Sequence, residues 1–248
     1  MFIIIFLLGL IIGSFLNVVI FRLEKNQSFL FGRSACPYCG QKIAWSDNIP
    51  IFSFIILAGR CRHCQKKISW QYPALELATA LIFLWLFFKF GLSERFFVYL
   101  FFAGILLMIF IYDLKNYLIL DQITLPAIVF AFLANLYLGL VWWQLILAGV
   151  IGALFFAIQF FVSSGKWVGD GDIRLGALMG LMLSWPNVLV ALFLAYLIGA
   201  VLGLILIVVK KKEMSSAVPF GPFLTFATLI TLLYGKEILQ WYLNLIYY

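Results

Sequence analysis

The sequence is poor in charged residues and contains a single histidine. Of its 248 residues, 11% are Asp, Glu, Lys or Arg, and the histidine is His63. One histidine leaves no candidate Ser-His-Asp set, which excludes most nucleophilic hydrolases. It also weakens the case for a zincin, which needs two histidines on one helix. The strand-like alternation of a membrane β-barrel and internal repeats are missing as well.

Apolar residues make up most of the chain. The sequence is 65% hydrophobic and 19% aromatic. Several apolar runs exceed the roughly 18 residues that cross a bilayer as a helix. Backbone polar groups in lipid must be satisfied within their own segment, so these runs predict helices. We therefore expect an all-α polytopic membrane protein with about eight transmembrane helices.

The first expected transmembrane helix covers residues 2–21. It has neither a basic region nor a small-residue cleavage site, so we interpret it as retained. Residues 22–72 are the one long polar stretch, and we expect a small zinc-ribbon-like domain there. Residues 73–248 are expected to form the main transmembrane domain. Its first five spans are predicted at about 73–89, 96–112, 122–140, 143–162 and 173–183. Pro186 opens the next span, which ends at Lys210-Lys-Lys212, and the last span follows the loop Glu213 to Pro222 and runs to about Tyr234.

The basic residues indicate the orientation in the membrane. If residues 22–72 are cytoplasmic, all but three of the 17 Lys and Arg lie on that side, including Arg33 and Lys210-Lys-Lys212. This distribution accounts for the net charge of +7 without a nucleic-acid partner. It also predicts that Asp113 and Asp172 lie at the same membrane boundary, on the cytoplasmic side.

All four cysteines lie in the polar stretch. They form two CxxC pairs, Cys36-Pro-Tyr-Cys39 and Cys61-Arg-His-Cys64, with a separation close to that of Cys₄ zinc sites. A reducing cytoplasm disfavours disulfides. We interpret the cysteines as ligands of a structural zinc ion in a closed tetrahedral site, with His63 as a less favoured ligand. A dithiol redox relay is the alternative.

Asp113 and Asp172 are the candidate catalytic pair. Carboxylates at a membrane boundary are costly to desolvate, which favours a functional role. Asp172 follows Gly169 and Gly171, and these glycines permit close backbone approach. Of two adjacent carboxylates one keeps a proton, so the charged one can deprotonate water while the other polarises a carbonyl. Each aspartate also has a structural alternative. Asp113 could be a charge at the end of a helix that pairs with Lys115, and Asp172 could be the N-cap of a helix.

Two polar residues inside the predicted spans are further candidates. Asn17 lies in the first span, where it belongs either to a helix-packing face or to a binding site. Glu76 lies a few residues inside the second span. It could reach the interface or pair with a basic group of the polar domain.

An ordered set of motifs resembles the bacterial type IV prepilin peptidases, which are GxGD aspartic peptidases. The similarity extends from about residue 9 to residue 225. Besides the two CxxC pairs and Asp113, the matching segments are Gly13-Ser-Phe-Leu-Asn-Val-Val-Ile-Phe-Arg22, Asn48-Ile-Pro50, Tyr72-Pro-Ala-Leu-Glu76, Gly169-Asp-Gly-Asp172 and Pro219-Phe-Gly-Pro222.

The resemblance implies an activity and its site. It implies an aspartic endopeptidase of the bacterial inner membrane that removes the short basic leader of prepilins or pseudopilins at the cytoplasmic face. It also implies N-methylation of the new amino terminus with S-adenosylmethionine. Asp113 and Asp172 would be catalytic, and Gly169 and Gly171 would shape the catalytic loop. Possible supporting residues are Asn17, Arg22, Glu76 and Arg174.

The sequence departs from the family pattern at two positions near the candidate site. Leu120 stands where the family has the proline of an LPD motif, and Arg174 stands where it usually has lysine. Two other functions remain open at this point. A thiol–disulfide oxidoreductase would depend on the cysteines, and a non-enzymatic assembly scaffold would not need the aspartates.

Overall fold

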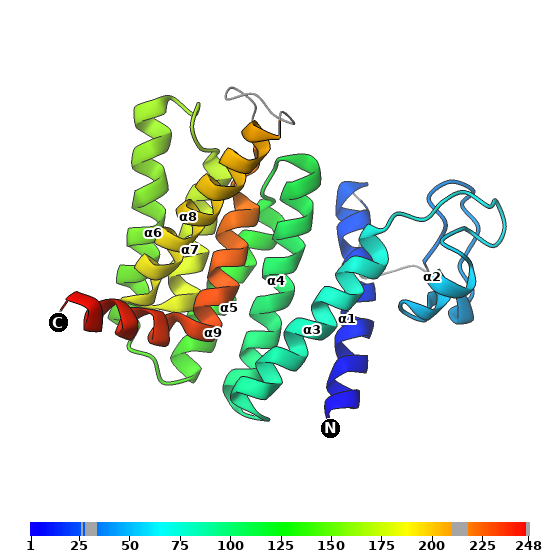
Figure 1. The fold of residues 1–248 in the computed structure, drawn as a ribbon, viewed down its shortest axis with the longest axis horizontal. Coiled ribbons are helices and arrows are strands. Elements are labelled where there is room, and N and C mark those ends of the chain that lie inside the picture. Colours follow the sequence, from blue (N-terminus) through cyan, green and yellow to red (C-terminus); the bar gives the residue numbers. More distant parts are fainter. Residues whose placement is uncertain (26, 28–33, 210–217, 247–248) are drawn as a thin grey trace. The chain divides into compact units, whose positions relative to one another are not determined.

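A computed structural model describes residues 1–25, 27, 34–209 and 218–246 of the chain (Figure 1). Across these residues the secondary structure is helical, and β-structure is limited to two isolated bridges. The all-α prediction is therefore confirmed. Arg33 and Lys210 to Lys212, which the orientation prediction uses, lie outside the described residues.

The chain divides into two compact units, residues 1–108 and 109–248. In the first unit, α1 (Phe2–Glu24) packs along α3 (Gln71–Phe90). A Cβ atom on Gly9 would collide with the backbone of Ala80, and one on Gly13 with the backbone of Glu76. Small residues let two helices approach this closely in a membrane. Gly13 therefore belongs to a helix-packing seam.

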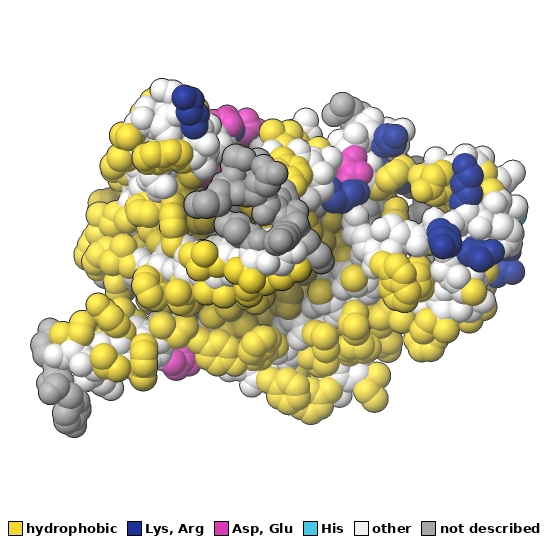
Figure 2. Space-filling model, turned by 45° about the horizontal axis from the view of Figure 1, so that its top comes forward, with side chains coloured by type: hydrophobic (Ala, Val, Ile, Leu, Met, Phe, Trp, Pro, Cys, Tyr) yellow, Lys and Arg dark blue, Asp and Glu magenta, His cyan; other side chains and the backbone are white. Residues whose placement is uncertain are grey.

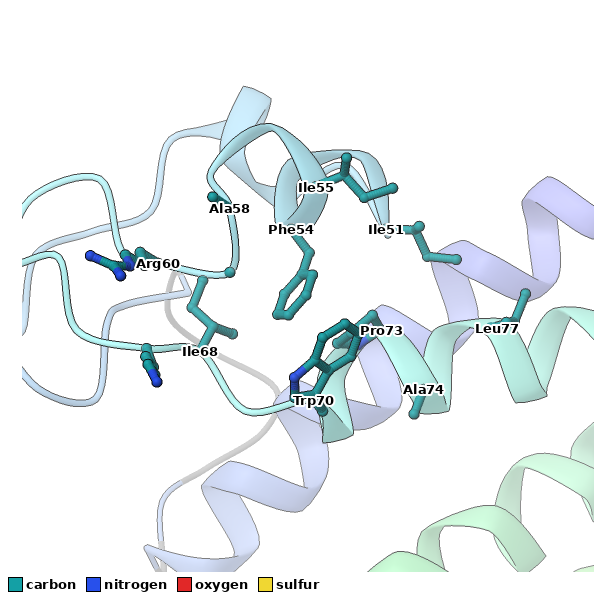
Figure 3. A pocket seen from close by; sticks show the side chains of 12 residues that line it. Ile51, Phe54, Ile55, Ala58, Arg60, Ile68, Trp70, Pro73, Ala74 and Leu77 are labelled. Atoms are coloured by element: carbon teal, nitrogen blue, oxygen red, sulfur yellow. The ribbon is translucent and has the colours of Figure 1, made fainter.

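In its described residues, the polar stretch between α1 and α3 contains only short elements. These are η1 (Trp45–Asn48) and α2 (Phe52–Ile56), together with bridges between Ala35 and Lys42 and between Arg60 and Lys67. A pocket lies between α2 and the start of α3 (Figure 3). Helix α4 (Glu94–Asn116) then leads from the first unit into the second.

In the second unit, α7 (Asp170–Leu183) is the central helix. It contacts α5 (Asp121–Tyr137), α6 (Trp142–Ser163), α8 (Asn187–Val208) and α9 (Gly221–Ile246). Gly152 and Gly176 bring the backbones of α6 and α7 together, and a Cβ atom on either would collide with the other helix. The buried helix α7 thus provides a fixed base for the residues at its N-terminus.

Every predicted span falls on a helix. Within the described residues, α1, α3, α4, α6, α8 and α9 are long and apolar enough to cross a membrane, and α5 is a shorter apolar helix. Helix α7 has 14 residues. Hydrophobic side chains cover much of the face in Figure 2, as a lipid-facing surface requires. The protein is a polytopic membrane protein.

The end of the last helix differs from the expected one. Helix α9 continues to Ile246, well beyond the predicted end of the last span at Tyr234. Lys236 and Glu237 interrupt the apolar run at this point, although the helix goes on. The compact units meet after Met108, within α4. The domain boundaries after residues 21 and 72 stay a prediction.

Candidate functional site

Asp113 lies in the last turns of α4, in the second unit, and is only 5% exposed. The backbone N–H of Gly221 donates a hydrogen bond to its carboxylate. Gly221 is the first residue of α9, where the N–H groups have no partner within the helix. A Cβ atom at Gly221 would collide with the carboxylate of Asp113. The beginning of α9 therefore binds this carboxylate closely, and only glycine leaves room for it.

Asp172 lies in the first turn of α7 and is 6% exposed. Its Oδ2 accepts a hydrogen bond of 2.9 Å from the N–H of Gly169, which is the N-cap residue. Asp172 is therefore the N3 residue of a capping arrangement and not the N-cap itself. A Cβ atom on Gly171 would collide with the side chain of Ile119. Gly171 thus lets the start of α7 lie in close contact with Ile119.

The structure brings these two carboxylates into the same part of the second unit. Asp113 and the neighbouring Asp170 both act electrostatically on the carboxylate of Asp172. Among the described residues, neither carboxylate forms an ion pair with Lys or Arg. Two buried carboxylates with backbone donors and no cation can differ in their protonation, as acid–base catalysis by a carboxylate pair requires.

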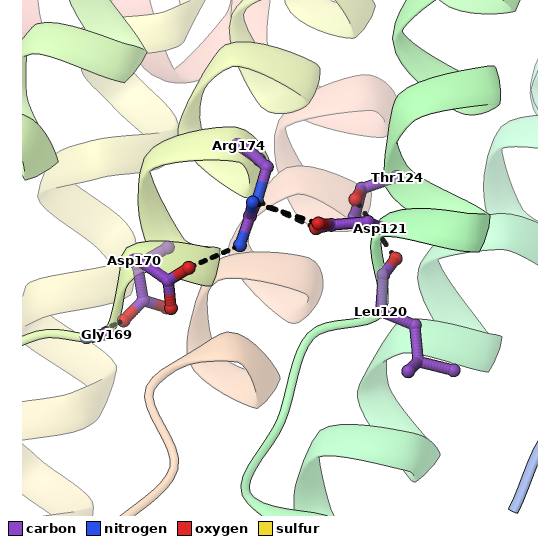
Figure 4. Close-up of polar contacts among 7 residues, drawn as sticks. Leu120, Asp121, Thr124, Gly169, Asp170 and Arg174 are labelled. Carbon is purple, nitrogen blue, oxygen red and sulfur yellow. Dashed lines mark hydrogen bonds and ion pairs between the residues drawn. The ribbon is translucent and has the colours of Figure 1, made fainter.

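A second pair of aspartates lies close by and has a cation between its members (Figure 4). The guanidinium of Arg174 contacts Oδ2 of Asp170 at 2.6 Å and Oδ1 of Asp121 at 2.9 Å. Asp121 begins α5 and Asp170 begins α7, so Arg174 connects the N-termini of two helices. The sequence analysis did not predict this link, because 53 positions separate Asp121 from Arg174.

Leu120, where the family motif has proline, is the N-cap residue of α5. Its φ of −81° is close to the value that a proline ring would fix. Its carbonyl accepts a hydrogen bond of 3.0 Å from the hydroxyl of Thr124. The departure from the family pattern is thus compatible with a regular start of the helix.

Asn17, Arg22 and Glu76 belong to the first unit. The Asn17 amide donates to the carbonyls of Gly13 and Tyr72 at 3.3 and 3.1 Å, and so connects α1 with α3. Arg22 is largely buried in the last turn of α1, where a cation interacts favourably with the helix dipole.

Glu76 is buried, with 6% of its surface exposed. Its carboxylate accepts a hydrogen bond of 2.8 Å from the N–H of Ile51 and another from the hydroxyl of Ser14. These partners are neutral groups, whereas the sequence analysis considered a basic group of the polar domain as the partner of Glu76. Glu76 connects the polar segment to the seam between α1 and α3.

The four cysteines form one cluster, as their spacing predicted. The sulfurs of Cys36, Cys39, Cys61 and Cys64 all lie within 4.8 Å of one another, and none is in a disulfide. The Sγ atoms of Cys36 and Cys64 are 3.8 Å apart. Four sulfurs about 2.3 Å from a central zinc ion would be about 3.8 Å apart in a regular tetrahedron. The donor set and its dimensions therefore fit zinc.

The backbone around the cysteines also favours metal binding. The N–H groups of Cys64 and His63 donate to the sulfur of Cys61 and lower its pKa to about 6. A thiolate at neutral pH is the form that binds a metal. Gly40 has the positive φ, 70°, expected of a knuckle turn. The imidazole of His63 is exposed and is not part of the cluster.

An exposed ion pair connects this cluster to η1. Arg62 donates to the two carboxylate oxygens of Asp47 over 2.8 and 2.6 Å. The hydrogen bonds from Arg62 lower the pKa of Asp47.

Comparisons with known proteins cover most of the chain. The model of the bacterial peptidase A24 N-terminal domain matches residues 7–90, and that of the type IV leader peptidase family matches residues 100–204. No solved structure matches the chain.

Several curated relatives carry the name prepilin leader peptidase/N-methyltransferase. The protein from Aeromonas hydrophila is 34% identical over 98% of this chain and 94% of its own length. Those from Bacillus subtilis and Pseudomonas aeruginosa are each 32% identical, over 98% and 96% of this chain and 98% and 92% of their own lengths. At this identity and coverage, the chain belongs to the type IV leader peptidase family.

Proposed function

We propose that this protein cleaves the short basic leader peptide from type IV prepilins or prepilin-like proteins, with Asp113 and Asp172 as its catalytic residues. The observation that carries the assignment of residues is the pair of buried carboxylates, each with a backbone N–H donor and neither paired with a cation. Family membership and the names of the relatives support the substrate class and an aspartic peptidase.

The two aspartates divide the chemistry of peptide hydrolysis. The ionised carboxylate takes a proton from a water molecule as the oxygen of that water attacks the scissile carbonyl carbon. The protonated carboxyl donates to the carbonyl oxygen and stabilises the charge that develops there. The proton then passes to the leaving amine, and the carbon–nitrogen bond breaks. The N–H groups of Gly169 and Gly221 orient the carboxylates throughout.

The second proposed activity is methylation of the new amino terminus. It follows from the name of the relatives, with S-adenosylmethionine as the methyl donor. The donor supplies the methyl group that the free amine accepts. The sequence has no recognisable glycine loop for a nucleotide, and we assign no described residue to the donor.

We propose that Cys36, Cys39, Cys61 and Cys64 hold a structural zinc ion. The closely spaced sulfurs and the backbone N–H groups that donate to the sulfur of Cys61 support this role. Four thiolate ligands leave no open position for a substrate, so the metal would stabilise the fold of the polar segment. A thiol–disulfide oxidoreductase would instead need reactive thiols without a tightly bound metal.

We propose that the catalytic pair faces the cytoplasm from the bacterial inner membrane. The distribution of Lys and Arg along the sequence supports this orientation. A prepilin or pseudopilin would then present its basic leader at the membrane surface, with its apolar helix in the bilayer.

The test is a cleavage assay with a prepilin-like substrate in detergent or reconstituted membranes. The wild type is compared with Asp113→Ala and Asp172→Ala, and mass spectrometry identifies the new N-terminus. We expect cleavage by the wild type alone, and a further methyl mass when S-adenosylmethionine is added. Cleavage that survives both substitutions would refute the catalytic assignment. If zinc-loaded wild type cleaves none of several substrates, the scaffold interpretation is favoured.

A further inference from the structure

The pocket of the first unit lies between the polar segment and the first turns of α3 (Figure 3). Its volume is about 830 Å³, within the range of pockets that hold a small molecule. Apolar and aromatic side chains form most of its walls, notably Ile51, Phe54, Ile55, Ile68, Trp70 and Leu77. The peptidase proposal makes no use of this pocket.

Two cations form the polar part of the pocket lining. Arg60 and Lys67 are partners in an isolated antiparallel bridge, so their side chains are direct neighbours. Like charges opposite each other are destabilising. Both residues are exposed, and neither pairs with a described carboxylate. The pocket lining contains no acidic residue. This end of the pocket therefore attracts an anion.

The other end of the pocket is continuous with a membrane helix. Leu77 lies on α3, one of the helices that can cross a membrane, and its side chain is 43% exposed. Leu81, one helical turn further along, is exposed as well. Figure 3 shows Arg60 at one end of the pocket and Leu77 at the other, with Phe54 and Trp70 between them. The rings of Phe54 and Trp70 are 5.0 Å apart between centroids.

We propose that this pocket binds an anionic phospholipid of the leaflet that borders this end of α3. The phosphate group contacts Arg60 and Lys67, and an acyl chain passes Trp70 and follows Leu77 and Leu81 into the bilayer. The lipid neutralises the two adjacent cations and ties the cysteine-bearing segment to the membrane. A basic leader peptide has the wrong charge for this end of the pocket.

The experiment is a native mass-spectrometry titration of the full-length, zinc-loaded protein with phosphatidylglycerol and, separately, phosphatidylcholine. The charge variant is Arg60→Gln/Lys67→Gln. Its matched control is Lys42→Gln/Lys66→Gln, which removes the same charge from the same segment outside the pocket lining. A third variant, Ala74→Phe, fills the apolar part of the pocket without a change of charge.

We expect the wild type and the control variant to retain phosphatidylglycerol in preference to phosphatidylcholine. The charge variant should bind phosphatidylglycerol about 25-fold more weakly, since each cation near an anionic lipid contributes roughly a factor of five. Ala74→Phe should weaken the binding of both lipids. Zinc content, measured in the same spectra, shows that each variant is folded.

Three results would overturn the proposal. Equal retention of phosphatidylglycerol by the charge variant and the control would show that the pocket is not the lipid site. Equal binding of the two lipids by the wild type would show that Arg60 and Lys67 do not select an anionic lipid. If Arg60→Gln/Lys67→Gln and Ala74→Phe retain lipid as the wild type does but lose leader cleavage, and the control variant does not, the pocket binds the protein substrate.

Discussion

Four aspartates lie at helix ends in the second unit, and they form two pairs with different surroundings. Asp113 and Asp172 are buried and accept hydrogen bonds from backbone N–H groups. Asp121 and Asp170 are exposed and share the guanidinium of Arg174. A buried carboxylate without a cation can change its protonation state during a reaction. A carboxylate that forms an ion pair with arginine serves to hold the structure.

The same contrast occurs within one short segment, where one aspartate pairs with arginine and the other is buried. Asp170 and Asp172 are two positions apart, and α7 turns one toward Arg174 and the other into the protein. The resemblance to the GxGD family selects Asp172, and burial provides an independent physical reason for the same choice. Substitutions in the buried pair should therefore affect leader cleavage far more than substitutions in the exposed pair.

The largest effect short of removing a catalytic carboxylate should come from Gly221→Ala. The added methyl group would collide with the Asp113 carboxylate and displace it. A displacement of about 1 Å at a reacting group can cost about 100-fold in rate, so we expect leader cleavage to fall by that factor or more. The control is Gly203→Ala, since a Cβ atom there meets no other group. Equal rates for the two variants would contradict the proposed contact.

Removal of the metal should have a smaller effect on cleavage than Gly221→Ala. The carboxylate pair belongs to the second unit, whereas the cysteine cluster belongs to the first. We expect one zinc ion per chain by elemental analysis, four thiols that react only after chelation, and a lower Tm. Acidification should release the metal as the thiolates are protonated. Four reactive thiols in metal-free protein with an unchanged Tm would favour the redox alternative.

Arg174→Gln should lower the cleavage rate by about fivefold. This is the amount expected when a partly exposed ion pair that positions the first turn of α7 is lost. Arg174→Lys keeps the charge, though not the fork that contacts two carboxylates, and should recover part of the rate. The pH profile of cleavage should change little in either variant, because Arg174 forms no ion pair with the buried carboxylates and solvent weakens the electrostatic effect of the exposed Asp170 on Asp172. A shifted profile would show that the two pairs are coupled.

The smallest effect is expected for the exposed pair of the first unit. Arg62→Gln removes the partner of Asp47, and both Tm and cleavage at neutral pH should change little. Because Arg62 lowers the pKa of Asp47, any contribution of this pair to stability is present at neutral pH. It is lost as the pH falls through the lowered pKa. A large drop in Tm for Arg62→Gln at neutral pH would contradict this estimate.

The sequence predicted the helices and the cysteine cluster because both follow from local patterns. Apolar runs of sufficient length become helices in lipid, and two CxxC pairs bring four sulfurs together in the described structure. The end of α9 was missed because Lys236 and Glu237 interrupt the apolar run without interrupting the helix.

Contacts between distant segments could not be predicted in this way. Nothing local to Gly221 shows that its N–H binds Asp113, and nothing near Arg174 points to Asp121. The partners of Glu76 were also of a different kind from those expected, since a backbone N–H and a hydroxyl carry no signal in the sequence. These contacts depend on which helix ends meet in the folded protein.

The most direct test of the central claim is the initial rate of leader cleavage by four single variants measured side by side, Asp113→Asn, Asp172→Asn, Asp121→Asn and Asp170→Asn. Each substitution replaces a carboxyl group with an amide of about the same size, which cannot act as an acid or base. Loss of a catalytic acid or base costs about 100-fold to 10,000-fold, so the first two variants should lose cleavage to that extent. The last two should stay within about fivefold of the wild type. Similar rates for all four variants would contradict the assignment of catalysis to the buried pair.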